Sequence, residues 1–194
     1  MNQQQLSRIQ INFTGAVVII TWVFLLWQYF NGGVPSHHLL NRADLPAISN
    51  WWGVAVLPAL TWLLLMRINK RVLGKAQQGI EQSTKQATEK FPSNIVFSFV
   101  AALMYGGLMS SFFVMGNQEI TGVMFQGIFV LALFFRLYRE GCALGFILSM
   151  SFAFGAVLPT IFACVIGLAA VILYHFPRFI YAMISTRLVR NKQN

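Results

Sequence analysis

With 194 residues, of which 57% are hydrophobic and 10% charged, this chain departs from soluble domains, where about 25% of residues are charged. The composition predicts an all-α membrane protein, a polytopic transmembrane helix bundle that forms one domain over residues 1–194. The net charge of +9 does not indicate nucleic acid, because the basic residues cluster at the ends of apolar runs. There they orient the chain and contact anionic lipid head groups.

A helix needs about 20 residues to cross a hydrocarbon core of about 30 Å. By this measure the apolar runs predict spans at residues 13–30, 48–66, 95–115 and 120–138. The first run ends in aromatic residues and Asn-Gly-Gly, so we interpret it as a retained span and not as a secretory signal peptide. Ser93 is the expected N-cap of the third span.

The last apolar run, residues 142–176, is too long for one crossing. Gly155 has a free backbone and Pro159 lacks an amide donor, so this stretch predicts a tight hairpin. We therefore expect a fifth and a sixth span at residues 141–157 and 159–176, both short or partly re-entrant.

The basic residues predict the orientation of the chain. With six crossings, all 14 lysines and arginines except Arg42 fall on one side. Both termini and a basic segment over residues 67–93 should then be cytoplasmic, with the segment continuing the second span as a surface helix, and the loop over residues 31–47 should lie outside. The small size and the lack of a eukaryotic sorting signal favour a bacterial cytoplasmic, or inner, membrane.

Small residues repeat at four-residue spacing in two of the predicted spans. Such ladders let membrane helices approach closely, and we interpret them as packing faces. On the fifth span they are Gly141, Gly145, Ser149 and Ala153, and on the third they are Gly106 with Ser110 and Gly107 with Ser111.

The loop after the first span carries metal-ligand side chains. His37, His38 and Asp44 could bind zinc, copper or iron. In a helix beginning after Pro35, His37 and Asp44 would share one face. Adjacent histidines diverge in regular structure, so both would bind one ion only if the backbone is irregular.

The same loop also has an architectural interpretation. Ser49 and Asn50 can cap the second span, Asp44 can cap a short surface helix and pair with Arg42, and Trp51 and Trp52 suit an interfacial aromatic belt. Recognition of a partner, or pH sensing by the histidines, is a third interpretation.

No carboxylate, lysine or arginine lies in the middle of a predicted span, which disfavours an ion-coupled transporter. Gln126 and Tyr105 are the main polar side chains there. Gln126 is expected to form an interhelical hydrogen bond or to contact a substrate. Gln126 and Tyr105 are candidate contacts for a ligand or partner, and with the serines they could line the lumen of a channel. Phosphate-binding glycine loops and hydrolase motifs are absent, and the two cysteines have no CxxC spacing.

These patterns leave three hypotheses for function. The first is a non-enzymatic transport or assembly component whose outer segment, residues 31–53, meets a ligand or partner through Arg42, Trp51 and Trp52. The second is a membrane oxidoreductase that uses metal or haem at His37, His38 and Asp44. The third is a channel for a neutral solute. Expected partners are membrane lipids, another protein or further copies of the chain, and no cofactor is identified.

Overall fold

The computed structural model describes residues 3–38, 44, 46–80 and 92–191, with the backbone alone for residues 37, 75–80 and 177–191. In these residues the chain forms α1 (Gln3–Phe30), β1 (Ser36–His38), β2 (Ala47–Ser49), the 3-10 helix η2 (Asn50–Trp52), α2 (Gly53–Ile80), α3 (Ser93–Val114), α4 (Gln118–Phe134), α5 (Glu140–Phe154) and α6 (Val157–Asn191).

In the part of the chain that the structure describes, four helical stretches are long and apolar enough to cross a membrane, namely residues 3–30, 50–74, 93–114 and 157–176. The helices α4 and α5 are also apolar but shorter, with 17 and 15 residues. Large apolar side chains stay exposed, as at Phe97, which is 75% exposed, and Val123, which is 70% exposed. The all-α class is thus confirmed, and the apolar helices indicate an integral membrane protein.

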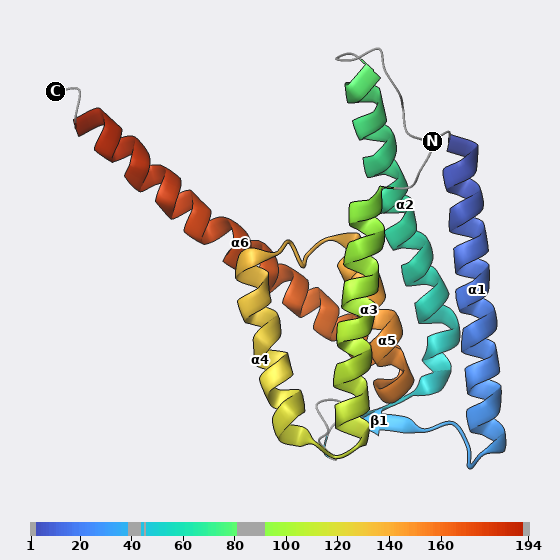
Figure 1. Cartoon of the computed structure of the whole chain (residues 1–194). Coiled ribbons are helices and arrows are strands. Elements are labelled where there is room, and N and C mark those ends of the chain that lie inside the picture. The colour runs from blue at the N-terminus through green and yellow to red at the C-terminus, as the bar shows by residue number, and fades with distance from the viewer. Residues whose placement is uncertain (1–2, 39–43, 45, 81–91, 192–194) are drawn as a thin grey trace.

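The helices form two groups that meet at α5 (Figure 1). The long helices α1 and α2 run antiparallel to each other, α5 packs beside α2, and α3 packs on α5, with α4 beyond α3 and α6 slanting away from the bundle. The strands β1 and β2 lie at the end of the bundle opposite the N-terminus. Because α5 packs against α2 as well as against α3 and α6, it links the group α1–α2 to the rest.

The short helix α5 also contributes to each of three buried apolar clusters. Leu144 packs with residues of α2, Ile147 with residues of α1 and α2, and Met150 with residues of α3, α4 and α6. The cluster around Ile147 includes Ala156, which lies in the turn between α5 and α6. The core therefore surrounds α5, although it is the shortest of the described α-helices.

Glycines on α5 allow α3 to approach closely. A Cβ atom on Gly145 would collide with the backbone carbonyl of Phe99, and one on Gly141 would lie 3.2 Å from the carbonyl oxygen of Ile95. On the α3 side, a Cβ atom on Gly106 would collide with the Ser149 hydroxyl. At positions 141 and 145, only glycine fits at this helix separation without a shift of the α3 backbone.

Two amide side chains join α1 to α2. Asn69 donates through Nδ2 to Oε1 of Gln10 at 2.9 Å, and Gln10 donates through Nε2 to the carbonyl oxygen of Trp62 at 3.2 Å. Gln10 is buried, so its hydrogen bonds offset the cost of removing an amide from water. The pair fixes the register of α1 against α2.

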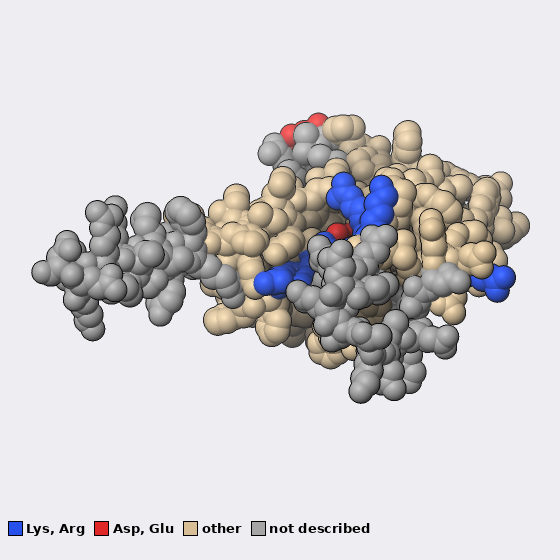
Figure 2. Space-filling view, turned by 90° about the horizontal axis from the view of Figure 1, so that it is seen from above, with Lys and Arg blue, Asp and Glu red and all other residues tan. Residues whose placement is uncertain are grey.

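The described basic side chains gather at one end of the bundle (Figure 2). This end contains the start of α1, the later half of α2 and the α4–α5 connection, and its described basic residues are Arg8, Arg67, Lys70, Arg71, Arg136 and Arg139. Glu140 lies among them and pairs with Arg71 at 2.7 Å. Asp44 and Glu119 are near the opposite end, in the β1–β2 loop and at the start of α4.

The outer loop differs from the expectation of a helix after Pro35. Residues 36–38 are extended and pair antiparallel with residues 47–49, with His37 opposite Ile48. Gly32 and Gly33, with φ angles of 111° and 95°, turn the chain from α1 into β1. The helical spacing that would have placed His37 and Asp44 on one face is therefore wrong.

Several expected element ends also differ. Ile48 belongs to β2, so the second helical stretch begins at Asn50, and α4 ends at Phe134 because Phe135 is extended, with φ −112° and ψ 150°. Ser93 is the first residue of α3, whose cap is Pro92 and has no side-chain hydrogen bond, so the Ser93 cap was wrong. The helix α2 continues past the apolar run to Ile80, and residues 81–91 of the predicted surface helix lie outside the described residues.

Candidate functional site

The β1–β2 hairpin is fixed to the end of α1. The buried Asn50 donates its backbone N–H to the carbonyl of Pro35 at 3.1 Å, and its side chain lies 3.5 Å from Oε1 of Gln28. Ser49 is the N-cap of η2, and its hydroxyl accepts from the backbone N–H of Trp51 at 3.4 Å. This loop is thus held by local hydrogen bonds.

Exposed aromatic side chains surround this end of the molecule. Trp51 packs edge-on against Trp22 with ring centroids 6.5 Å apart, while Trp52 is 61% exposed. Trp27 and Tyr29 add further exposed rings near the end of α1. Tryptophan and tyrosine favour the boundary between hydrocarbon and head groups, so this belt marks the level of a membrane surface.

The structure leaves the metal hypothesis for this loop untested. Among the described side chains, no three of the histidine, cysteine, aspartate and glutamate types gather as metal ligands would. The His37 side chain and Arg42 are outside the described residues, and His38 and Asp44 are exposed with interactions of their own. A metal site and an Arg42–Asp44 pair here stay predictions.

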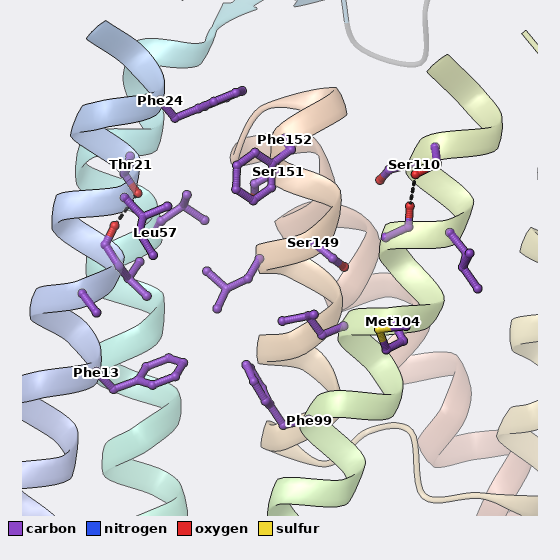
Figure 3. A pocket seen from close by; sticks show the side chains of 18 residues that line it. Phe13, Thr21, Phe24, Leu57, Phe99, Met104, Ser110, Ser149, Ser151 and Phe152 are labelled. Atoms are coloured by element: carbon purple, nitrogen blue, oxygen red, sulfur yellow. Dashed lines mark hydrogen bonds between the residues drawn. The ribbon is translucent and has the colours of Figure 1, made fainter. Parts of the chain in front are cut away.

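A lateral groove of about 760 Å³ separates α1 from α3, with α5 as its floor (Figure 3). An aromatic pair bounds each end. Phe13 meets Phe99 with ring centroids 5.7 Å apart, and Phe24 meets Phe152 at 4.9 Å. Since Phe13 and Phe24 are eleven positions apart on α1, the groove extends for about 16 Å.

The hydroxyl groups along this groove already donate hydrogen bonds within the protein. Thr21 donates to the carbonyl of Val17 at 2.7 Å, Ser151 donates to the carbonyl of Ile147 at 2.6 Å, and Ser110 points at Sδ of Met150 at 3.4 Å. None of the described residues that line the groove is titratable. The groove can therefore hold an apolar chain or helix, but it offers no titratable side chain for acid–base catalysis.

The predicted packing residues divide between this groove and the α3–α5 contact. Gly106, Ser110, Gly141, Gly145 and Ser149 are buried, and glycines 106, 141 and 145 face the partner helix directly. Ser110 and Ser149 also line the groove, together with the less buried Gly107 and Ser111, and a Cβ atom on Gly107 would meet nothing within 4 Å. Ala153 is half-buried further along α5.

Tyr105 and Gln126 do not share one lumen in the structure. The Tyr105 hydroxyl donates to the carbonyl of Met124 at 2.6 Å, which joins α3 to α4. Gln126 is exposed, on the same face of α4 as Val123 and Val130, which are 70% and 56% exposed. No described residue forms a hydrogen bond with the Gln126 side chain.

A second cavity was not predicted from the sequence. It lies between α3, α4, α5 and α6, and Arg136, Arg139 and Tyr174 are among its lining residues. Arg136 and Arg139 lie in the α4–α5 connection, whereas Tyr174 lies far along the chain on α6, so no local pattern indicates that they meet. The sequence did give one indication of the two arginines, because arginines that follow an apolar run lie at the level of the lipid head groups.

The comparisons with known proteins do not assign a family. No protein-family model matches the chain, and no match was found among curated proteins or among solved structures. The arrangement of the side chains therefore carries the functional argument.

Proposed function

We propose that this protein is a non-enzymatic component of a membrane assembly, and that it contacts another membrane helix through the exposed face of α4. Transport by that assembly is compatible with this role. The exposed apolar surfaces and the lack of titratable side chains in the α1–α3 groove support a binding role over a catalytic one.

The observation that carries this proposal is the position of Gln126. It is the central residue of the 17-residue helix α4, and its side chain is exposed among apolar neighbours. An amide that reaches hydrocarbon without a hydrogen-bond partner is costly, and membrane helices satisfy such groups across helix interfaces. Gln126 can both donate and accept, so a polar group on another helix would stabilise it there.

The neighbours of Gln126 leave room for such a helix. Gly122 lies one turn earlier on the same face, and a Cβ atom there would meet nothing within 4 Å. A small residue one turn from a polar one lets two helices approach closely enough for an interhelical hydrogen bond.

The proposed assembly component is a multi-pass protein of a bacterial inner membrane, with six crossings and both termini in the cytoplasm. The gathering of the described basic side chains at the end that contains the start of α1 supports this orientation. At about 22 Å, α5 is shorter than the hydrocarbon core, which supports a fifth crossing that is short or partly re-entrant, whereas the sixth stretch, residues 157–176, is long enough to cross. The hairpin and Trp52, on the outer side, provide a second surface for a ligand or partner.

The orientation can be tested by labelling single cysteines in intact cells. The two native thiols, at Cys142 and Cys164, are free and would first be replaced by alanine. A cysteine at position 36 should react with a membrane-impermeant reagent from outside, and one at position 82 should react only after the cells are opened. Labelling of both positions from one side would contradict six crossings.

The assembly can be tested by photo-crosslinking in the native membrane. A photoreactive amino acid at Val130 should yield a discrete protein adduct, whose mass shows whether the partner is a second copy or another protein. The control is Ile19 on α1, which is similarly exposed at 65% but far from α4.

Gln126→Leu should remove the adduct at position 130 without lowering the thermal stability of the purified monomer, because leucine suits hydrocarbon better than an unpaired amide. Adducts with lipid alone at position 130, or an equal protein adduct at position 19, would reject the proposed contact.

A further inference from the structure

The cavity between α3, α4, α5 and α6 has a volume of about 730 Å³. Apolar side chains form most of its wall, among them Phe97, Phe146, Ala163 and Ile166. Gly167 on α6 leaves space at the wall, because a Cβ atom there would meet nothing within 4 Å. Such a wall suits a hydrocarbon chain.

Charged and aromatic side chains from the α4–α5 connection and from α6 meet at one end of this cavity. Arg136 donates through Nε to the Tyr174 hydroxyl at 2.7 Å, and its guanidinium lies 5.1 Å from the centre of the Tyr174 ring. Tyr138 packs against Tyr174 and approaches His175, with its hydroxyl 3.3 Å from Nε2. The hydrogen bond to Tyr174 raises the pKa of Arg136, which therefore stays cationic at all relevant pH values.

The positive charge at this end has no acidic partner among the described residues. Glu140 is next to Arg139 in sequence, but its carboxylate pairs with Arg71 at 2.7 Å. Arg139 is also the N-cap of α5, and it makes no capping bond through its side chain. The first N–H groups of α5 add the positive end of a helix dipole to the two guanidinium groups.

From this combination we infer that the cavity binds an anionic phospholipid of the surrounding bilayer. The phosphate contacts Arg136 and Arg139, and an acyl chain extends along the apolar wall toward Ala163. Charge complementarity at the head group and the apolar wall both favour this occupant. Neither a zwitterionic lipid nor a free phosphate matches both features. The inference requires a membrane location and does not depend on the proposed assembly.

Native mass spectrometry of the purified full-length chain would test this site. The probes are phosphatidylglycerol and phosphatidylcholine with identical acyl chains. We expect phosphatidylglycerol to be retained preferentially, and Arg136→Gln/Arg139→Gln to weaken its binding at least about tenfold, to the level of phosphatidylcholine. The matched control is Arg8→Gln/Arg67→Gln, which removes the same charge from the same end of the molecule and should keep the preference.

A second variant tests the apolar part. Gly167→Leu adds a side chain where there is space, so it should fold and lower the binding of both lipids. Glycerol 3-phosphate, which has the phosphate without acyl chains, should not displace bound phosphatidylglycerol.

Equal losses of phosphatidylglycerol binding in the two double-arginine variants would show that general surface charge causes the effect, and would reject the site. Displacement by glycerol 3-phosphate, or unchanged binding in Gly167→Leu, would reject an acyl chain in the cavity. If the Arg136→Gln/Arg139→Gln variant does not fold, the preference is tested instead by the melting temperatures of the native chain and the control variant with each lipid. Phosphatidylglycerol should raise both, and phosphatidylcholine should raise neither.

Discussion

Two pairs of small residues on α3 are only one position apart and differ in burial. Gly106 and Ser110 are buried beside α5, with Ser110 at the edge of the groove between α1 and α3, whereas Gly107 and Ser111 are less buried and line that groove. A Cβ atom on Gly106 would collide with the Ser149 hydroxyl, and one on Gly107 would meet nothing within 4 Å. The same sequence pattern thus forms a helix contact on one face of α3 and the wall of the groove on the next.

This difference shows what a small-residue ladder requires. Small side chains permit close approach, but a contact forms only where the partner helix has complementary small residues at the same height. On α5 the partners are Gly141 and Gly145, while α1 presents the bulky Phe13 and Phe24 to the other face. Phe13 meets Phe99 of α3 and Phe24 meets Phe152 of α5, and these contacts bound the groove.

The largest effect is expected for Gly145→Leu. Its side chain would have to enter the space of the Phe99 carbonyl, and a backbone atom cannot rotate away as a side chain can. We expect a loss of about 3 kcal/mol or more in the free energy of unfolding, measured by denaturant titration in detergent micelles. A stability equal to that of the native chain would show that α3 and α5 do not pack at this distance.

A smaller effect is expected for Ser110→Leu, with Ser111→Leu as its matched control. Ser110 is 7% exposed, so leucine would overfill the α3–α5 contact and cost about 1–3 kcal/mol. Ser111 is exposed beside the groove, and leucine there should change the melting temperature little. Equal destabilisation of the two variants would contradict the difference between the faces.

The pair Gly106→Ala and Gly107→Ala should differ in sign. Alanine at position 106 displaces the Ser149 hydroxyl from its bond to the carbonyl of Phe146, which costs about 1 kcal/mol. Alanine at position 107 meets open space and restricts the unfolded chain, which stabilises the protein by about 0.4–1 kcal/mol. The same micelle titration measures both, and a more stable Gly106→Ala variant would reverse the assignment of the two faces.

The smallest effect should come from Arg71→Gln. The ion pair with Glu140 joins α2 to α5 by charge, and the Arg71 side chain is 40% exposed. Solvent screening limits such a pair to at most about 1 kcal/mol. A loss as large as that of Ser110→Leu would mean that charge, and not packing, holds α5 in place.

The helices were largely predictable from the sequence because apolar runs of this length typically form membrane-spanning helices. The predicted elements were wrong where the local backbone conformation, and not hydrophobicity, determines the structure. Strands of three residues are too short to produce an alternating pattern, so β1 and β2 looked like loop or helix. The early end of α4 follows from the extended Phe135, whose side chain continues the apolar run and gives no signal of a helix end.

The candidate sites depended on tertiary structure to a greater degree. Gln126 was predicted as a hydrogen-bond partner between helices, but its exposure on α4 follows only from the packing of Ile128 and Ala132 on the opposite face. The cavity near Arg136 requires α6 to pass beside the α4–α5 connection, and the sequence contains no local signal of that crossing.

The turn between α5 and α6 has a consequence for how the chain is made. Gly155, with a φ angle of 71°, interrupts the helix, and Ala156 beside it is buried under Val17 of α1 and Leu57 of α2. Irregular backbone at membrane depth is tolerated only where protein covers it. Because a chain emerges N-terminus first, α1 and α2 are synthesised before this turn. The order of the helices along the chain thus supplies the cover before the interrupted segment leaves the ribosome.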